Sequence, residues 1–93
     1  MNPDTTATNE KTSIQVIERM VALLDALAHY PDPVSLKELS ATTGLHPSTA
    51  HRILNDLVLK RFVDRVDAGS YRLGMRLLEL GNIVKSRLNV REA

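Results

Sequence analysis

The side chains best suited to recognising a ligand lie in one short segment, residues 47–57. Apolar residues recur there at the spacing of a single helical face: Ala50, Ile53, Leu54 and Leu57. Polar residues fall on the opposite face and its flanks: Ser48, Thr49, His51, Arg52, Asn55 and Asp56. Hydroxyl, amide and guanidinium groups reach base edges and phosphates when such a helix lies in a major groove. The pattern fits either a DNA-reading helix or an ordinary amphipathic helix with a solvated polar face.

The start of this predicted helix is clearly marked. Pro47 suits the first helical position, because a backbone N–H there would be unpaired anyway. Either His46 or Ser48 is a candidate N-cap. The helix N-terminus carries a partial positive charge and free N–H groups, so it favours a phosphate. We expect the helix to end near Lys60, followed by Arg61 at a position where glycine is more comfortable. If Arg61 is left-handed there, the cost is about 1 kcal/mol.

The residues before it predict a second, shorter helix. Ser35, followed three residues later by Glu38, forms a capping box that marks a helix start. Gly44 supplies the left-handed residue that ends a helix, and Ser40 is small enough for two helices to cross closely. Two short helices joined by a tight turn that contains glycine form a helix-turn-helix unit.

A β-hairpin is predicted next. Two strand-like segments, residues 62–66 and 70–73, flank a loop over residues 67–69 that ends in glycine. The expected inward residues are Phe62, Tyr71 and Leu73. Arg65 and Arg72 would then face outward. A hairpin directly after a helix-turn-helix is a wing, so Arg72, with Arg65 beside it, would hold the DNA backbone or reach a minor groove. The alternative is two solvated arginines on a small hairpin.

Further helices are predicted on both sides of this unit. Residues 1–12 are small and polar and are expected to be disordered, so the first helix would begin at Ser13 and end before Pro31. This helix is apolar around more than half of its circumference, which indicates either a wide core face or a second burial against a partner subunit. A last helix is expected from Met75 to about Val90, where it would pair subunits or lead into a further domain.

The composition limits the class of protein. A chain of 93 residues is long enough for one small domain, and without cysteine it has no disulfide or thiolate chemistry. The net charge is only +1, but residues 46–76 hold six basic and three acidic residues, and six minus three gives a local +3. This excess is a modest electrostatic footprint of a DNA-binding surface. Neither a signal sequence nor a membrane-spanning segment is visible, so we expect a cytoplasmic protein without membrane contact.

Motifs for catalysis, cofactors and metals are missing from the sequence. There is no phosphate-binding glycine loop, no dinucleotide fingerprint and no zinc-ligand spacing. The histidines, His29, His46 and His51, are not accompanied by clustered carboxylates or thiols. Aromatic residues make up 3% of the chain, too few for a platform that stacks single-stranded bases. We therefore expect neither an enzyme nor a bound cofactor or metal.

Several of these segments resemble the IclR family of bacterial transcription regulators. They are Glu18-Arg19 with residues 23–27, residues 36–39, residues 43–54, and Tyr71-Arg72-Leu73-Gly74. The resemblance extends over residues 13–93, with Ser40 where alanine is usual and Arg61 where glycine is frequent. It implies a mainly α fold with a small β-hairpin, namely a winged helix-turn-helix (a three-helix core plus a wing) followed by a linker helix.

The same resemblance implies partners. Family members bind a palindrome-like operator as a homodimer, or as a pair of dimers, paired through the first helix and the linker helix. A larger C-terminal domain that binds a small-molecule effector follows the linker helix in the family. That domain is absent from this sequence, so effector response is expected only in a longer chain.

We therefore predict sequence-specific binding of double-stranded DNA, with residues 47–60 as the recognition helix. Arg52 is expected at a phosphate or a guanine edge, and Ser35 and Lys37 at a phosphate. The expected DNA-binding residues are Ser35, Lys37, His46, Ser48, Thr49, His51, Arg52, Asn55, Arg65 and Arg72. The predicted organisation is a tail over 1–12, a DNA-binding domain over 13–74 and a linker and dimerisation helix over 75–93. The alternative is a winged-helix module that binds another protein instead of DNA.

Overall fold

The computed structural model describes the backbone of residues 3–92 and the side chains of residues 14–88. Its elements are α1 (Pro3–Ala28), β1 (Val34–Ser35), α2 (Leu36–Thr43), α3 (Pro47–Leu59), β2 (Val63–Val66), β3 (Ser70–Leu73) and α4 (Met75–Glu92). The strands form one antiparallel sheet in the order β1-β3-β2. Helices α2 and α3 are the helix-turn-helix, and the β2–β3 hairpin is the wing. The predicted winged helix-turn-helix fold is confirmed.

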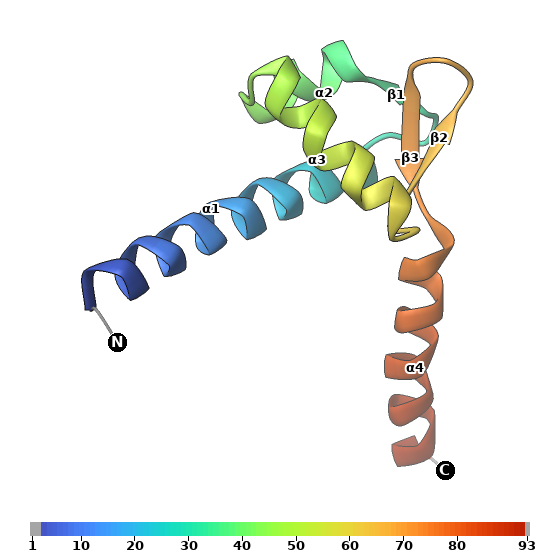
Figure 1. Ribbon diagram of the computed structural model, residues 1–93. Coiled ribbons are helices and arrows are strands. Elements are labelled where there is room, and N and C mark those ends of the chain that lie inside the picture. Colours follow the sequence, from blue (N-terminus) through green and yellow to red (C-terminus); the bar gives the residue numbers. More distant parts are fainter. Residues whose placement is uncertain (1–2, 93) are drawn as a thin grey trace.

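Two helices extend beyond the body of the molecule. The first turns of α1 and most of α4 project as separate arms (Figure 1). The radius of gyration is 16.1 Å, whereas a compact domain of this length has about 12 Å. Both arms carry exposed apolar side chains: Ile14, Val16, Ile17 and Val21 on α1, and Met75, Leu78, Leu80, Ile83, Val84 and Leu88 on α4.

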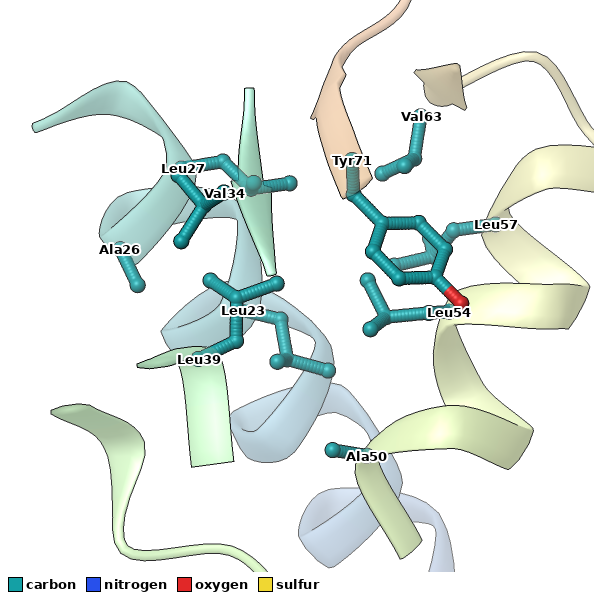
Figure 2. Packing of buried hydrophobic residues seen from close by; sticks show 10 residues of the cluster. All are labelled: Leu23, Ala26, Leu27, Val34, Leu39, Ala50, Leu54, Leu57, Val63 and Tyr71. Carbon is teal, nitrogen blue, oxygen red and sulfur yellow. The ribbon is translucent and has the colours of Figure 1, made fainter. Parts of the chain in front are cut away.

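A single core joins the helix-turn-helix to the sheet (Figure 2). Every element from α1 to β3 contributes at least one fully buried side chain: Leu23, Ala26, Leu27, Val34, Leu39, Ala50, Leu54, Leu57, Val63 and Tyr71. The Tyr71 ring reaches from β3 towards α3. Since α3 supplies Ala50, Leu54 and Leu57, its predicted apolar face is the face that packs inward.

The turn between α2 and α3 is closed by local hydrogen bonds. Gly44 is left-handed, with φ 76°, and its N–H donates to the carbonyl of Ser40 at 2.9 Å, as predicted for a helix end. The Ser40 hydroxyl donates to the carbonyl of Leu45. The serine that stands where alanine is usual therefore satisfies a carbonyl of the turn that an alanine would leave to water.

Helix α3 ends at Leu59 with Lys60 as its C-cap, close to the predicted end. The next residue, Arg61, is left-handed, with φ 67°. The N–H groups of Arg61 and Phe62 donate to the carbonyls of Val58 and Leu57 at 3.1 and 3.0 Å, which is the pattern of a Schellman motif. Arg61 thus occupies the position that glycine usually takes, at a cost of about 1 kcal/mol in backbone conformation.

Two elements differ from the sequence prediction. Helix α1 begins at Pro3, so the predicted start at Ser13 and the predicted disorder of the residues before it are wrong for residues 3–12; residues 1 and 2 lie outside the described part. Proline favours a first helical position, and residues 4–12 contain neither glycine nor a second proline to interrupt the helix. Strand β1 was not predicted, because two residues give no alternation and Val34 pairs with the distant Tyr71.

The first wing strand, β2, is shifted by one residue from its predicted alternation, whereas β3 is not. Phe62 lies before β2 and packs partly buried against the core, and Val63 is the buried residue of that strand, 1% exposed. Leu73, predicted to face inward, is 38% exposed because it lies at the end of β3, at the margin of the core. Tyr71 is buried as predicted. The shift places Arg65 opposite Tyr71, and its consequence appears at the interface described next.

Candidate nucleic-acid interface

The N-terminus of α3 is held by the residue before it. Of the two candidate caps, His46 takes the role: its Nδ1 accepts the backbone N–H of Ser48 at 3.2 Å and lies 2.9 Å from the Ser48 hydroxyl. Pro47 occupies the first helical position as predicted. An accepting Nδ1 leaves the imidazole N–H on Nε2, so the exposed His46 keeps one donor for a ligand.

The outer face of α3 carries the polar groups that the sequence placed there. Ser48, His51 and Arg52 are exposed, while Thr49 and Asn55 are half-buried. Their backbone is fixed from below, because Ala50, Leu54 and Leu57 on the inner face are buried in the core. This face can therefore enter a groove without a change in the helix that carries it.

Helix α1 adds a cation beside this face that the sequence prediction missed. Val16 and Arg19 of α1 and Thr49, Arg52 and Asp56 of α3 line one open hollow of about 190 Å³. Arg19 is exposed and lies on the same side as Arg52. No local pattern marks Arg19, since only the packing of α1 across α3 brings the two arginines together.

The start of α2 is arranged as the capping box predicted. The Ser35 Oγ accepts the backbone N–H of Glu38 at 3.1 Å, and Lys37 is exposed in the first turn. A serine hydroxyl that accepts from a cap still has its own proton to donate. Ser35 and Lys37 are therefore both able to hold a phosphate here.

The two wing arginines have different environments. Arg72 is exposed, as predicted, and its Nε lies 3.6 Å from Asp64 Oδ2 in an exposed ion pair. Arg65 turns back towards α3: its Nη2 donates to Asn55 Oδ1 at 3.0 Å and to the Tyr71 hydroxyl at 3.2 Å. The prediction that Arg65 faces outward is wrong, because the strand register places it on the same face as Tyr71.

Part of the local positive charge is neutralised near α4. Glu79 accepts hydrogen bonds from Arg76 at 3.1 Å and from Arg61 at 2.9 Å. These hydrogen bonds, that from Arg76 first, hold the pKa of the Glu79 carboxyl below its ordinary value of 4.5. Arg52 and Lys60 form no ion pair among the residues whose side chains are described. The free cations of this surface are therefore on and beside α3.

The described residues contain no group of three or more histidine, cysteine or acidic side chains arranged to hold a metal ion. Within the same residues, no helix has the length and apolar character needed to cross a bilayer.

The sequence and the fold have clear counterparts among known proteins. Residues 16–67 match the model of the IclR helix-turn-helix domain. The chain is 34% identical over 80 residues to the HTH-type transcriptional regulator XynR of Escherichia coli, covering 85% of this chain and 32% of XynR. It is 42% identical over 81 residues to the glycerol operon regulatory protein of Streptomyces griseus, covering 86% and 31%.

Solved structures give the same result. The crystal structure of IclR from Thermotoga maritima matches with a TM-score of 0.72 and 28% identity, over 85% of this chain and 32% of that one. An IclR homolog from a Microbacterium strain matches with a TM-score of 0.70 and 30% identity, over 83% and 32%. The chain thus spans about a third of the length of the relatives it matches.

Proposed function

Because this chain belongs to the IclR family and carries its DNA-binding fold, we propose that it recognises a specific double-stranded operator through α3. The observation that supports this most directly is the two-sided character of α3. Ala50 and Leu54 lock one side into the core, while His51 and Arg52 are exposed on the other. A rigid helix with exposed donors is what direct readout in a major groove requires.

The surrounding groups have complementary roles in this proposal. Ser48, Thr49, His51, Arg52 and Asn55 face the base edges, and His46 and Arg19 lie at the margin of the groove. Ser35 and Lys37 hold a phosphate at the start of α2. Arg72 leaves Asp64 for the DNA backbone, since an exposed ion pair contributes only about 0–1 kcal/mol. Arg65 is not among the proposed direct contacts, because Nη2 of its guanidinium bonds to Asn55 and Tyr71 and so turns the side chain towards α3.

Dimerisation is the second part of the proposal. Exposed apolar residues of α1, among them Ile14, Ile17 and Val21, and of α4, among them Leu78 and Ile83, are available for a second copy. Two copies related by a twofold axis would read a palindrome-like operator with half-sites about 10 bp apart, or a multiple of this. Longer relatives would add a pairing of dimers.

We also propose how this chain relates to the whole protein. Residues 13–74 form the DNA-binding domain, and residues 75–93 form the linker and dimerisation helix. Effector response belongs to the part of the relatives that this chain does not match. The function is regulatory binding without catalysis, and it takes place in the bacterial cytoplasm, where the operator is.

The proposal is tested by selecting duplexes from a randomised library with the 93-residue chain and measuring their binding by fluorescence anisotropy at two salt concentrations. We expect enrichment of an inverted repeat, with affinity that falls steeply as salt rises, because phosphate contacts release counterions. Absence of binding at low salt and high protein concentration would contradict the proposal and favour a protein-binding module.

Arg52 gives the sharpest single test of this surface. Arg52→Ala is expected to weaken binding to the selected duplex by about 1–3 kcal/mol if the guanidinium reads a base, with much less effect on scrambled duplex. Arg87→Ala, which removes one exposed arginine from α4, is the matched control and should leave the discrimination unchanged. An equal loss on both duplexes would make Arg52 a phosphate contact.

A further inference from the structure

A three-residue cluster connects the wing to the recognition helix. Arg65 of β2 is the strand partner of Tyr71 of β3, and both lie beside Asn55 of α3. Tyr71 is 2% exposed, so its ring and hydroxyl have fixed positions. The Arg65 guanidinium carbon lies 5.6 Å from the centre of the Tyr71 ring. A buried aromatic residue thus holds an arginine that is otherwise exposed.

One nitrogen of the guanidinium makes both hydrogen bonds. Arg65 Nη2 donates to Asn55 Oδ1 at 3.0 Å and to the Tyr71 hydroxyl at 3.2 Å. This nitrogen carries two protons, so each acceptor receives one of them. The two protons of Nη2 thus match its two acceptors, and the bond to Oδ1 gives the amide of Asn55 a defined orientation.

That orientation follows from the chemistry of arginine. A guanidinium can only donate hydrogen bonds, so the amide group that faces it must be the carbonyl oxygen of Asn55. The amide NH₂ is then the group left for DNA. An unrestrained asparagine recognises adenine with both ends of its amide, accepting from N6 and donating to N7. The oxygen keeps a second lone pair, but Arg65 fixes the direction of the amide, so Asn55 presents its NH₂, and not both ends of the amide, to a base.

We propose that Arg65 is a positioning residue that makes Asn55 a hydrogen-bond donor, so that Asn55 selects a base with acceptors in the major groove. Guanine, with O6 and N7, and thymine, with O4, present such acceptors. Cytosine is rejected because its amino group is a donor that would face another donor. Adenine is no longer preferred, because Asn55 no longer makes the two hydrogen bonds to N6 and N7. This inference rests on the proposed function, namely that α3 lies in a major groove.

The first experiment compares base preferences of three variants by selection from the same randomised duplex library. Arg65→Met frees the amide of Asn55, so the preference should relax at one base position by roughly three- to tenfold, the equivalent of one hydrogen bond. Adenine should then appear at that position among the selected duplexes, and the dependence of affinity on salt should not change. Arg87→Met, on α4 and outside the proposed DNA surface, controls for the loss of one positive charge. The preference at this base position should be preserved whatever its effect on dimerisation.

Asn55→Asp keeps Arg65 in place and reverses the chemistry of the exposed group. One carboxylate oxygen would face Arg65, and the other would present an acceptor to the groove. The preference at the same base position should therefore switch to cytosine or adenine, which present amino donors. A structural role for Asn55 alone would not produce this switch. Thermal unfolding of both variants shows whether they are folded.

A readout without DNA separates this inference from the proposed function. The side-chain NH₂ of Asn55 should be as rigid as the backbone in ¹⁵N relaxation, and Arg65→Met should make it mobile. A mobile amide in the wild-type chain would overturn the inference. A loss of affinity for all sequences in Arg65→Met, with a salt slope reduced by about 1, would also overturn it and make Arg65 a phosphate contact. A rigid amide without any sequence selection would refute the proposed function, and with it the role in base selection.

Discussion

The helix-turn-helix and the wing with α4 are held in place by interactions of different range. In the helix-turn-helix, the fixing hydrogen bonds join near neighbours in the sequence: Ser35 with Glu38, Ser40 with Leu45, and His46 with Ser48. In the wing and α4 they join distant residues: Arg65 with Asn55, Gly74 with Phe62, and Arg61 with Glu79.

This difference has a mechanical consequence. A bond between near neighbours forms with the helix that contains it, so the caps of α2 and α3 need no other element, although the core still fixes where α3 lies. A bond between distant residues needs both of its elements in position, so the wing and α4 are sensitive to each other and to α3. The recognition helix is the rigid part of the interface, and the wing and α4 are the part that a substitution can reorient.

The largest effect is expected from the core contact of α3. Leu54→Ala removes a side chain that is 0% exposed and should lower the free energy of unfolding by about 2–5 kcal/mol. Leu59→Ala, on the same helix but 77% exposed, should change it by less than about 0.5 kcal/mol. Denaturant unfolding of both variants checks the contrast. Equal losses would show that α3 is not anchored by its inner face.

The next largest effect is expected at Gly74, which forms the corner between the wing and α4. A Cβ at Gly74 would collide with the carbonyl of Arg61 and lie 2.9 Å from the carbonyl carbon of Phe62, both backbone groups. Gly74→Ala should therefore destabilise the fold by about 1–3 kcal/mol, as overpacking does.

Gly81→Ala is the control for this corner. Nothing lies within 4 Å of a Cβ at Gly81 in α4, and alanine is favoured over glycine in a helix by about 0.5–1 kcal/mol. Thermal unfolding should thus shift in opposite directions for the two variants. A neutral Gly74→Ala would mean that α4 is free to move away from the corner.

A smaller effect is expected at the start of α2. Ser35→Ala removes the acceptor for the N–H of Glu38 and should cost about 1 kcal/mol of stability. Ser35→Thr keeps a capping hydroxyl and should restore most of the loss. Denaturation midpoints without DNA measure this effect separately from any phosphate contact. If alanine and threonine behave alike, the cap does not stabilise α2.

The smallest effect is expected from the ion pairs of Glu79, because the carboxyl is exposed. Its pKa is lowered in the folded chain by Arg76 and Arg61, so the folded state favours the charged form. The resulting stabilisation is fully present above about pH 4.5, the ordinary pKa of this side chain, and is lost as the pH falls through the lower folded pKa.

The test compares the melting temperatures of the wild type and Glu79→Gln at pH 7 and at pH 3. The difference between them should be small at pH 7, should shrink at pH 3 and should also fall with added salt. A difference that is independent of pH would assign the effect to packing of the side chain instead of its charge.

The elements with local signals were predictable from the sequence. The cap at Ser35, the left-handed Gly44 and Pro47 at the start of α3 all lie where the pattern placed them. The buried face of α3 also followed from its spacing. Each of these features is set by steric or hydrogen-bonding rules that act within a few residues.

Other features depended on tertiary structure. Strand β1 exists because Val34 meets Tyr71, a pairing that no local pattern contains. The predicted alternation of β2 was one residue out of register, and a shift of one residue reverses every side chain of a strand. For this reason Val63 is the buried residue of β2 while Phe62 packs partly buried against the core, and the exposed Arg65 bonds to the recognition helix.

The same division applies to the interface with DNA. The sequence by itself determined which polar groups share the outer face of α3, because helical geometry fixes that face. Only the tertiary structure decided which groups lie beside that face. The packing of α1 places Arg19 next to Arg52, and Arg65 of the wing donates a hydrogen bond to the side-chain carbonyl of Asn55. The physical reason is range, since a helix defines its own faces within a few turns, whereas the neighbours of a side chain are set by how distant segments pack.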